Sequence, residues 1–358
     1  MKKMTALLLV LTLMLSVLVG CSSTNNGGNT NNGGNSDGDS GSSSVKVGFI
    51  ITGGKLGDNA ANDSQYAGLT QFSEEYGAEL KYVEISELQD VEPAVRNYID
   101  QGMNLIIFNG AEASEFVPSI AAEYPDVMFL VGEGTVAEAE NILNYRTDVA
   151  DASFLCGAFA ALMSQELGGE LAAGFVGGTR NPNLERSQYG FTAGVEYVGG
   201  EASVAYTNSF TDAATAKELT HQMFGSNIRV VQAFAGGANT GVFEAALNMG
   251  EGYYSMGGAT GQFDLSDSII ASNCKFLGDL AYSLCVQYVE GTLPHGTVSY
   301  GLTDGAVDIA YAPDQRADII PQEIKDTIDD LREKIINGEI DVPTTQAEYD
   351  AFSAAQVD

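Results

Sequence analysis

Six turns of the sequence carry the residue types that hold a small polar ligand. Glycine lets a backbone come close to a bound molecule, while asparagine, aspartate and threonine side chains exchange hydrogen bonds with it. Each turn follows an apolar run, and the turns begin at residues 53, 109, 177, 208, 235 and 257: GGKLGDNAAND, NGAEAS, GGTRNPN, NSFTD, AGGANTG and GGATGQ. Turns after strands are rich in glycine and asparagine in any protein, so only the repetition of the pattern indicates a ligand site.

Phosphate binding and catalysis find little support in these turns. The first turn has neither the G-x-x-x-x-G-K-[ST] nor the G-x-G-x-x-G spacing, and the carboxylates of Asp58 and Asp63 would repel a phosphate. G-x-S-x-G is absent. The sequence has two histidines, His221 and His295, which offer few ligands for a His-based zinc site and few bases for a catalytic triad. We therefore expect no enzyme activity, no cofactor and no metal. An extracellular hydrolase on the same scaffold is the minor alternative.

The elements that position the turns alternate between strands and helices. Apolar runs of strand length begin at residues 45, 79, 104 and 126, with helical patterns between them and Asp90 as the expected cap of one helix. A second round of the same kind runs from an expected helix at 148–169 to an expected strand at 252–258. Strands that are apolar on both faces belong in parallel sheets covered by helices. The sequence therefore predicts an α/β fold with two doubly wound, Rossmann-like lobes joined by a hinge.

The two lobes divide the chain unevenly. We assign 45–150 and part of 263–300 to the N-terminal lobe, and 151–262 and 301–358 to the C-terminal lobe. The segment that begins at SIIASNC fits neither round alone, so we expect it to cross between the lobes and complete both sheets, before a final helix at 321–338. In open parallel sheets a ligand lies beyond the carboxyl ends of the strands, which is where the six turns are.

The N-terminal residues have the pattern of a lipoprotein signal peptide. Lys2 and Lys3 precede the apolar run Leu7–Val19, and LVGC ends at Cys21, the expected lipidation site. Residues 1–21 are therefore expected to be the signal peptide, and the polar residues 22–44 a flexible linker without a core. These features predict a protein anchored by lipid to the outer face of the cell membrane.

The net charge argues against a nucleic acid partner, and the cysteine spacing argues against a metal site. The chain has 16 Lys and Arg against 48 Asp and Glu, a formal net charge of −32, so we expect no nucleic acid partner. Cys156, Cys274 and Cys285 lie in apolar or helical contexts without metal-like spacing, which favours a role as small buried hydrophobic residues.

Three segments of the second round carry distinctive motifs: GFVGGTRNPNLERSQYGFTAGVEYV (174–198), AYTNSFTDAATAKELTHQMF (205–224) and VVQAFAGGANTGVFEAA (230–246). They resemble the basic membrane protein (BMP) family of ABC importer substrate-binding lipoproteins, and the resemblance extends from about Val45 to about Ile309. It implies a type I periplasmic binding protein architecture, a ligand clamped between two lobes, and an ABC transporter permease as partner of a monomer. The family includes a purine nucleoside receptor, so a neutral purine nucleoside is the first candidate ligand.

The resemblance also assigns ligand contacts. Asp58 and Asn62 keep polar positions of the family's first turn, Phe210 keeps an aromatic that stacks on the base, and Lys275 keeps the lysine after a strand. Gly236 and Gly237 keep a turn at which the backbone approaches the ligand closely. From the turns themselves we add Asn109 and Asn239 as candidate contacts.

Four residues depart from the family's nucleoside-binding pattern. Ala60 and Ala61 stand where the family has Ser and a stacking Phe, while Ala259 and Gly261 stand where it has aspartates, one of them expected to hold ribose. The ligand therefore stays open between a purine nucleoside and a flavin, a sugar-like signal or another heterocycle. Import and presentation to a membrane sensor both stay open as roles.

Overall fold

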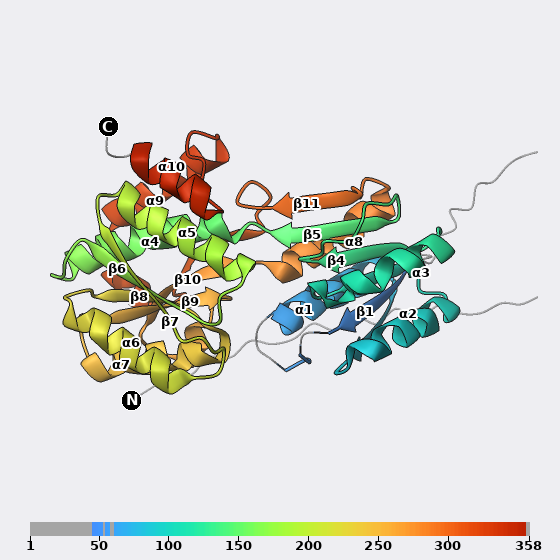
Figure 1. Ribbon diagram of the computed structural model, residues 1–358, viewed down its shortest axis with the longest axis horizontal. Coiled ribbons are helices and arrows are strands. Elements are labelled where there is room, and N and C mark those ends of the chain that lie inside the picture. The colour runs from blue at the N-terminus through green and yellow to red at the C-terminus, as the bar shows by residue number, and fades with distance from the viewer. Residues whose placement is uncertain (1–44, 53, 58–60, 356–358) are drawn as a thin grey trace, which may run out of the picture. The chain divides into compact units, whose positions relative to one another are not determined.

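The computed structural model describes residues 45–52, 54–57 and 61–355 (Figure 1). The expected signal peptide with Cys21, the expected linker, and Asp58 lie outside the described residues. Within these described ranges, no helix is both long enough and apolar enough to cross a membrane.

Six strands of the described chain form a first sheet in which all neighbours pair in parallel. Their order across the sheet is β11-β5-β4-β3-β1-β2. Every residue of the central strands β3 and β4 is buried, as expected of a parallel sheet covered on both faces. The strands are β1 (Lys46–Ile51), β2 (Glu79–Glu84), β3 (Leu105–Phe108), β4 (Met128–Gly132), β5 (Ile142–Thr147) and β11 (Gly296–Tyr300).

The second sheet, again of six strands in the described chain, repeats this order position by position as β12-β10-β9-β8-β6-β7. Its pairs are parallel except at one edge, where β12 runs antiparallel to β10. The strands are β6 (Ala172–Gly177), β7 (Glu201–Tyr206), β8 (Val230–Phe234), β9 (Tyr254–Ala259), β10 (Ile269–Lys275) and β12 (Val307–Tyr311).

Helices cover both faces of each sheet, and we call each sheet with its helices the first lobe and the second lobe. On the first sheet, one face carries α1 (Ala61–Tyr76) and α8 (Leu277–Glu290), and the other carries α2 (Val91–Asp100) and α3 (Val117–Glu123). On the second sheet, one face carries α4 (Val149–Glu166), α5 (Pro182–Tyr197) and α9 (Gln322–Ile336), and the other carries α6 (Ala213–Gly225) and α7 (Asn239–Met249). The helix α10 (Gln346–Ala355) packs on α5.

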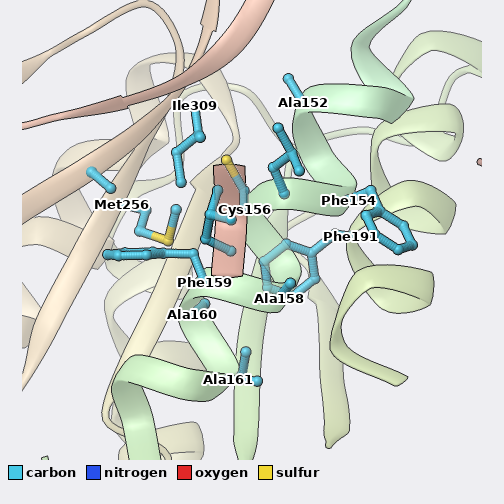
Figure 2. Packing of buried hydrophobic residues seen from close by; sticks show 14 of the residues in the cluster. Ala152, Phe154, Cys156, Ala158, Phe159, Ala160, Ala161, Phe191, Met256 and Ile309 are labelled. Atoms are coloured by element: carbon cyan, nitrogen blue, oxygen red, sulfur yellow. The ribbon is translucent and has the colours of Figure 1, made fainter. Parts of the chain in front are cut away.

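The helix α4 is the centre of the second lobe's core. Its side chains, among them Cys156 and Phe159, lie next to Met256 of β9 and Ile309 of β12 (Figure 2). Its contact with α5 brings the two backbones together, because a methyl group added at Gly157 would collide with the main chain of Phe191. The helix α4 is buried on nearly all sides, and its small side chains let neighbouring elements pack closely against it.

In the described residues the chain passes between the sheets three times. It leaves the first sheet between β5 and α4, returns between β10 and α8, and crosses again in residues 301–306 between β11 and β12. At the second crossover, the main-chain nitrogen of Gly278 donates to Oγ of Ser64 at 3.1 Å, which ties the start of α8 to α1.

The predicted fold class is confirmed by this architecture, and the predicted alternation of strands and helices is found from β1 to β9. The prediction had no counterpart for β5 and α10. Asp90 occupies the N-cap position of α2 as expected, but its side chain makes no capping hydrogen bond, and a short 3-10 turn at Leu88–Asp90 precedes the helix. Cys156, Cys274 and Cys285 are buried and free of disulfides within the described chain.

Candidate ligand-binding site

A cavity of about 460 Å³ lies at the carboxyl ends of the strands in the second lobe, and we call it the second-lobe cavity. The turns after β6, β8 and β9 all contribute to it, because the carboxyl ends of parallel strands meet at one edge of the sheet. Among the described residues that line it, every side chain is uncharged. They are Asn181, Asn183, Leu184, Phe210, Phe234, Gly236, Gly237, Asn239, Thr240, Phe243, Gly258, Ala259, Thr260, Gln262 and Leu265.

The ring of Phe210 lies on glycine backbone at the wall of this cavity. A methyl group added at Gly178 would collide with the ring, and one added at Gly236 would approach it to 3.5 Å. Gly236 also has a φ of +59°, which L side chains rarely adopt. Phe210 is nevertheless 42% exposed, an unusual state for a large aromatic residue. Part of the ring is therefore supported by glycine backbone, and the rest is exposed at the cavity wall.

Asn239 shapes the neighbouring turn. Its Oδ1 accepts a hydrogen bond from the main-chain nitrogen of Ala235 at 2.6 Å, and its Nδ2 donates to Oε1 of Gln262 at 3.1 Å. The same Oε1 accepts from the nitrogen of Gly258 at 3.0 Å. Ala259 and Gln262 have φ values of 69° and 51°, so this segment is held in a conformation that non-glycine residues seldom adopt. Gln262 is not among the ligand contacts predicted from the sequence.

In the first lobe, Asn62 and Asn109 bond to each other. Nδ2 of Asn109 donates to Oδ1 of Asn62 at 2.7 Å, and Oδ1 of Asn109 accepts from the main-chain nitrogen of Thr52 at 2.8 Å. Asn62 also donates from Nδ2 to the carbonyl of Lys55 at 3.3 Å. The pair thus ties the start of α1 to the carboxyl ends of β1 and β3.

A larger cavity of about 800 Å³ lies between the lobes, and we call it the inter-lobe cavity. The first lobe supplies residues of α1 and the start of α8, and the second lobe supplies residues 260–265 and the end of β10. Its charged side chains, among the described residues, are Lys275 and the three aspartates Asp63, Asp264 and Asp279. The Lys275 side chain is 10% exposed.

Lys275 belongs to a charge cluster that bridges the lobes. Its Nζ lies 3.8 Å from Oε1 of Glu133 at the end of β4, and Nη2 of Arg186 in α5 lies 3.3 Å from Oε2 of the same carboxylate. Burial lowers the pKa of Lys275, and the Glu133 carboxylate opposes that change. Glu133 has a φ of 52° and also accepts from Oγ1 of Thr147 at 3.1 Å, so its carboxylate is fixed where the two lobes meet.

Glu133 was missed by the sequence analysis, because nothing in its local sequence marks it. Arg180 and Arg186 lie six residues apart in the sequence but have different partners. Arg180 lies 3.7 Å from Glu185 and over the ring of Tyr206, in keeping with local pairing. The acid paired with Arg186 is instead 53 residues away in the sequence, in the other lobe.

Comparison with solved structures defines the class of fold. A solute-binding protein of an ABC transporter system from Aeropyrum pernix K1 superposes with a TM-score of 0.72 at 24% identity, over 87% of this chain and 98% of that chain. A transcriptional activator of the comK gene from Bacillus halodurans superposes with a TM-score of 0.69 at 25% identity, over 81% and 97%. The two repeated sheets and three crossovers are those of a type I periplasmic binding protein.

The particular family follows from sequence comparison. The family model described as "ABC transporter substrate-binding protein PnrA-like" matches residues 44–346, and the chain belongs to this family. Basic membrane protein A2 of Borrelia garinii is 27% identical over 85% of this chain and 90% of that protein, and basic membrane protein B of Borreliella afzelii is 28% identical over 88% and 92%. Membership implies a small-molecule ligand and a permease partner.

Proposed function

We propose that this chain is a lipid-anchored, extracytoplasmic solute-binding protein that closes its two lobes on a small neutral ligand, with a purine nucleoside as first candidate. The observation that carries the proposal is the ring of Phe210, which is supported on glycine backbone at the wall of an uncharged cavity. A flat heterocycle stacks on such a ring, and an uncharged wall does not require a charged ligand. The expected lipid anchor at Cys21 would hold the protein at the membrane beside its permease.

Within this proposal, Phe210 stacks on the base while Gly236 and Gly237 let the backbone approach it. Asn239 holds the turn that forms the cavity wall, so its contribution is mainly to position that wall. Lys275 faces the inter-lobe cavity, where its ammonium can donate to a ligand oxygen. Asn62, Asn109 and Asp58 would approach from the first lobe when the lobes close.

A non-nucleoside ligand is the second candidate, either a flavin, a sugar-like signal or another heterocycle. The uncharged cavity accepts any flat neutral ring, and the residues at Ala61, Ala259 and Gly261 offer neither the second aromatic ring nor the carboxylates that suit a nucleoside. The similarity to a solved transcriptional activator is compatible with a role in sensing rather than import. Identification of the bound ligand would not separate these roles, but the co-expressed membrane partner would.

The test is direct binding to the purified mature chain. We expect mass spectrometry of the protein purified from its own cells to recover an unmodified neutral heterocycle. In a thermal shift panel of purine nucleosides, flavins, sugars and amino acids, the true ligand class should raise the melting temperature, because binding to the folded state stabilises it. A panel in which no compound shifts the melting temperature contradicts the proposal, and recovery of a chemically altered compound would favour a hydrolase.

A further inference from the structure

We propose that Arg316 is a positioning residue for ligand binding, because its guanidinium group holds residues 262–266, which we call the wall segment, in place between the second-lobe cavity and the inter-lobe cavity. Arg316 follows β12 in the sequence and is not among the described residues that line either cavity. It therefore acts through the segment that it holds. The inference rests on the proposed function in one respect, since it takes the second-lobe cavity as the place where the ligand binds.

The wall segment contributes to both cavities. Gln262 and Leu265 line both of them, while Phe263 and Asp264 line the inter-lobe cavity. The middle of the segment, Phe263–Leu265, is a single 3-10 turn, and Leu265 is 56% exposed. A single turn of this kind has few hydrogen bonds of its own, and their geometry is poorer than in an α-helix. The position of the wall segment consequently depends on its contacts with the rest of the second lobe.

The backbone that leads into the turn is in an unfavourable conformation. Ala259 and Gln262 have left-handed φ values of 69° and 51°, which cost free energy for residues other than glycine. Such a conformation persists only where the surrounding structure holds it. Oε1 of Gln262 accepts hydrogen bonds from the main-chain nitrogen of Gly258 and from Nδ2 of Asn239. These bonds act at the start of the wall segment, so the turn itself takes its support from elsewhere.

Arg316 supplies this support, although it is 50 residues away from Ser266 in the sequence. Its Nη1 donates to the carbonyl of Phe263 at 2.9 Å and to that of Ser266 at 2.8 Å, so one nitrogen joins the two ends of the turn. Nε and Nη2 donate to the two carboxylate oxygens of Asp314 at 2.8 Å and 2.6 Å, which fixes the plane of the guanidinium. The Arg316 side chain is 15% exposed. A fixed and largely buried cation thus makes charge-assisted hydrogen bonds to the backbone of the wall segment.

Arg332 in α9 provides a comparison within the same lobe. Its side chain is 21% exposed, and the hydrogen bonds that it makes within the described chain go to the carboxylates of Asp308 and Asp329. Arg332 is therefore similar to Arg316 in burial and in its pairing with an acid, but it holds no part of a cavity wall. This makes Arg332→Gln the matched control for Arg316→Gln.

Hydrogen exchange of the ligand-free protein tests whether Arg316 holds the wall segment. The amides of Gly258 and Leu265 donate to Gln262, so their exchange rates report on the conformation of this segment. We expect Arg316→Gln to speed both rates by about 10-fold or more, because the segment opens locally more often. Arg316→Lys should give a smaller increase, because an ammonium can still donate to the carbonyls but cannot form the double contact with Asp314.

Two further readouts separate positioning from general stability. Arg332→Gln should leave the exchange of Gly258 and Leu265 within about 2-fold of wild type, and the amides of β8 should keep their rates in Arg316→Gln. Unchanged exchange at Gly258 and Leu265 in Arg316→Gln overturns the proposal. An equal increase at these amides and in β8 also overturns it, since it would show a loss of stability throughout the lobe.

Calorimetric titration with adenosine and with riboflavin tests the consequence for binding. For the probe that binds the wild type, Arg316→Gln should raise the dissociation constant by about 5-fold to 10-fold, because a loosened wall has to be ordered again when the ligand binds. Arg332→Gln should stay within about 2-fold of wild type. Faster exchange with unchanged affinity would overturn the role of Arg316 in binding. Failure of both probes to bind the wild type would contradict the ligand classes of the proposed function, whereas the exchange rates would still decide whether Arg316 holds the wall segment.

Discussion

The two lobes share one strand order but divide the candidate site unequally. In the second lobe, the turns after β6, β8 and β9 enclose a cavity without help from the other lobe. In the first lobe, the corresponding polar residues Asn62 and Asn109 bond to each other and to the backbone. The same topology therefore gives a preformed cavity in one lobe and a self-satisfied surface in the other.

This difference indicates how the lobes divide their work. Within the proposed function, the cavity of the second lobe receives the ring before the lobes close, and the first lobe then covers it. The Glu133 cluster joins the lobes through Arg186 and Lys275, so it adds an ionic contribution to the contact between the lobes. Four predictions can break or sharpen this comparison.

The largest effect is expected where helices of the second lobe touch through backbone. Gly157→Val should lower the free energy of unfolding by about 3 kcal/mol or more, because the added side chain would collide with the main chain of Phe191. Chemical denaturation measures the change. Gly225→Ala at the end of α6 is the matched control, since a methyl group there has open space around it and should be neutral or slightly stabilising. Similar stabilities for the two variants would contradict the close α4–α5 packing.

The next effect concerns Asp151, which lies in the first turn of α4, just after the chain crosses from β5 to the second lobe. Burial, and then the neighbouring Asp148, raise the pKa of Asp151 from 3.8 to about 7 in the folded protein. The folded state therefore retains a proton that the unfolded state releases, and this group's contribution to stability is lost as the pH rises from about 4 to about 7. The difference in the free energy of unfolding between Asp151→Asn and wild type should therefore shift in favour of the variant by on the order of 2–4 kcal/mol from pH 4 to pH 8.

Chemical denaturation of wild type and Asp151→Asn across pH 4 to 8 isolates the contribution of Asp151 to the pH dependence of stability, because the other acidic groups contribute equally to the two proteins. Asp330→Asn, on the exposed side of α9, serves as control. A constant difference in stability between wild type and Asp151→Asn at every pH would show that Asp151 does not titrate in this range.

Much of this architecture could be predicted from the sequence, because apolar runs and glycine turns mark most strands and helix ends. The missed strand β5 has the sequence ILNYRT, in which polar residues interrupt the run. Asn144 in that strand is nevertheless buried. Its Oδ1 accepts a hydrogen bond from the main-chain nitrogen of Val136, and its Nδ2 donates to the carbonyl of Val136. The missed helix α10 has no fully buried residue. Tyr349 and Ser353 donate to Glu196 of α5, and the ring of Phe352 packs against Phe154. Apolar runs therefore predict fully buried elements, while half-buried elements that combine polar bonds with a few aromatic contacts lack such a run.

The site was less accessible to prediction than the fold. The family resemblance indicated Phe210, Gly236 and Gly237, and turn composition indicated Asn239. All four line one cavity. Glu133 could not be found this way, because its partners Arg186 and Lys275 are distant in sequence and in part belong to the other lobe. Local sequence also gives no sign of the left-handed backbone at Gln262, which depends on hydrogen bonds to Gly258 and Asn239.

A smaller effect is expected on ligand binding at the second lobe. Phe210→Ala should weaken the binding of a flat ligand by about 1–3 kcal/mol, because it removes the stacking face at the cavity wall. Phe210→Tyr keeps the ring and should bind within a few-fold of wild type. Calorimetry with the ligand identified by mass spectrometry measures both variants. Unchanged affinity in Phe210→Ala would mean that the ligand does not stack on Phe210, and the main contrast between the two lobes would be lost.

The smallest effect is expected at the ionic bridge between the lobes. Arg186→Gln and Glu133→Gln should each lower the free energy of unfolding modestly, because the contact between the lobes loses a partly buried ion pair. A double-mutant cycle should give a coupling of about 0.5–1 kcal/mol that declines at high salt. Arg180→Gln is the matched control, since Arg180 is paired within its own lobe. Strict additivity of the Arg186 and Glu133 variants would mean that this ion pair contributes nothing to the contact between the lobes.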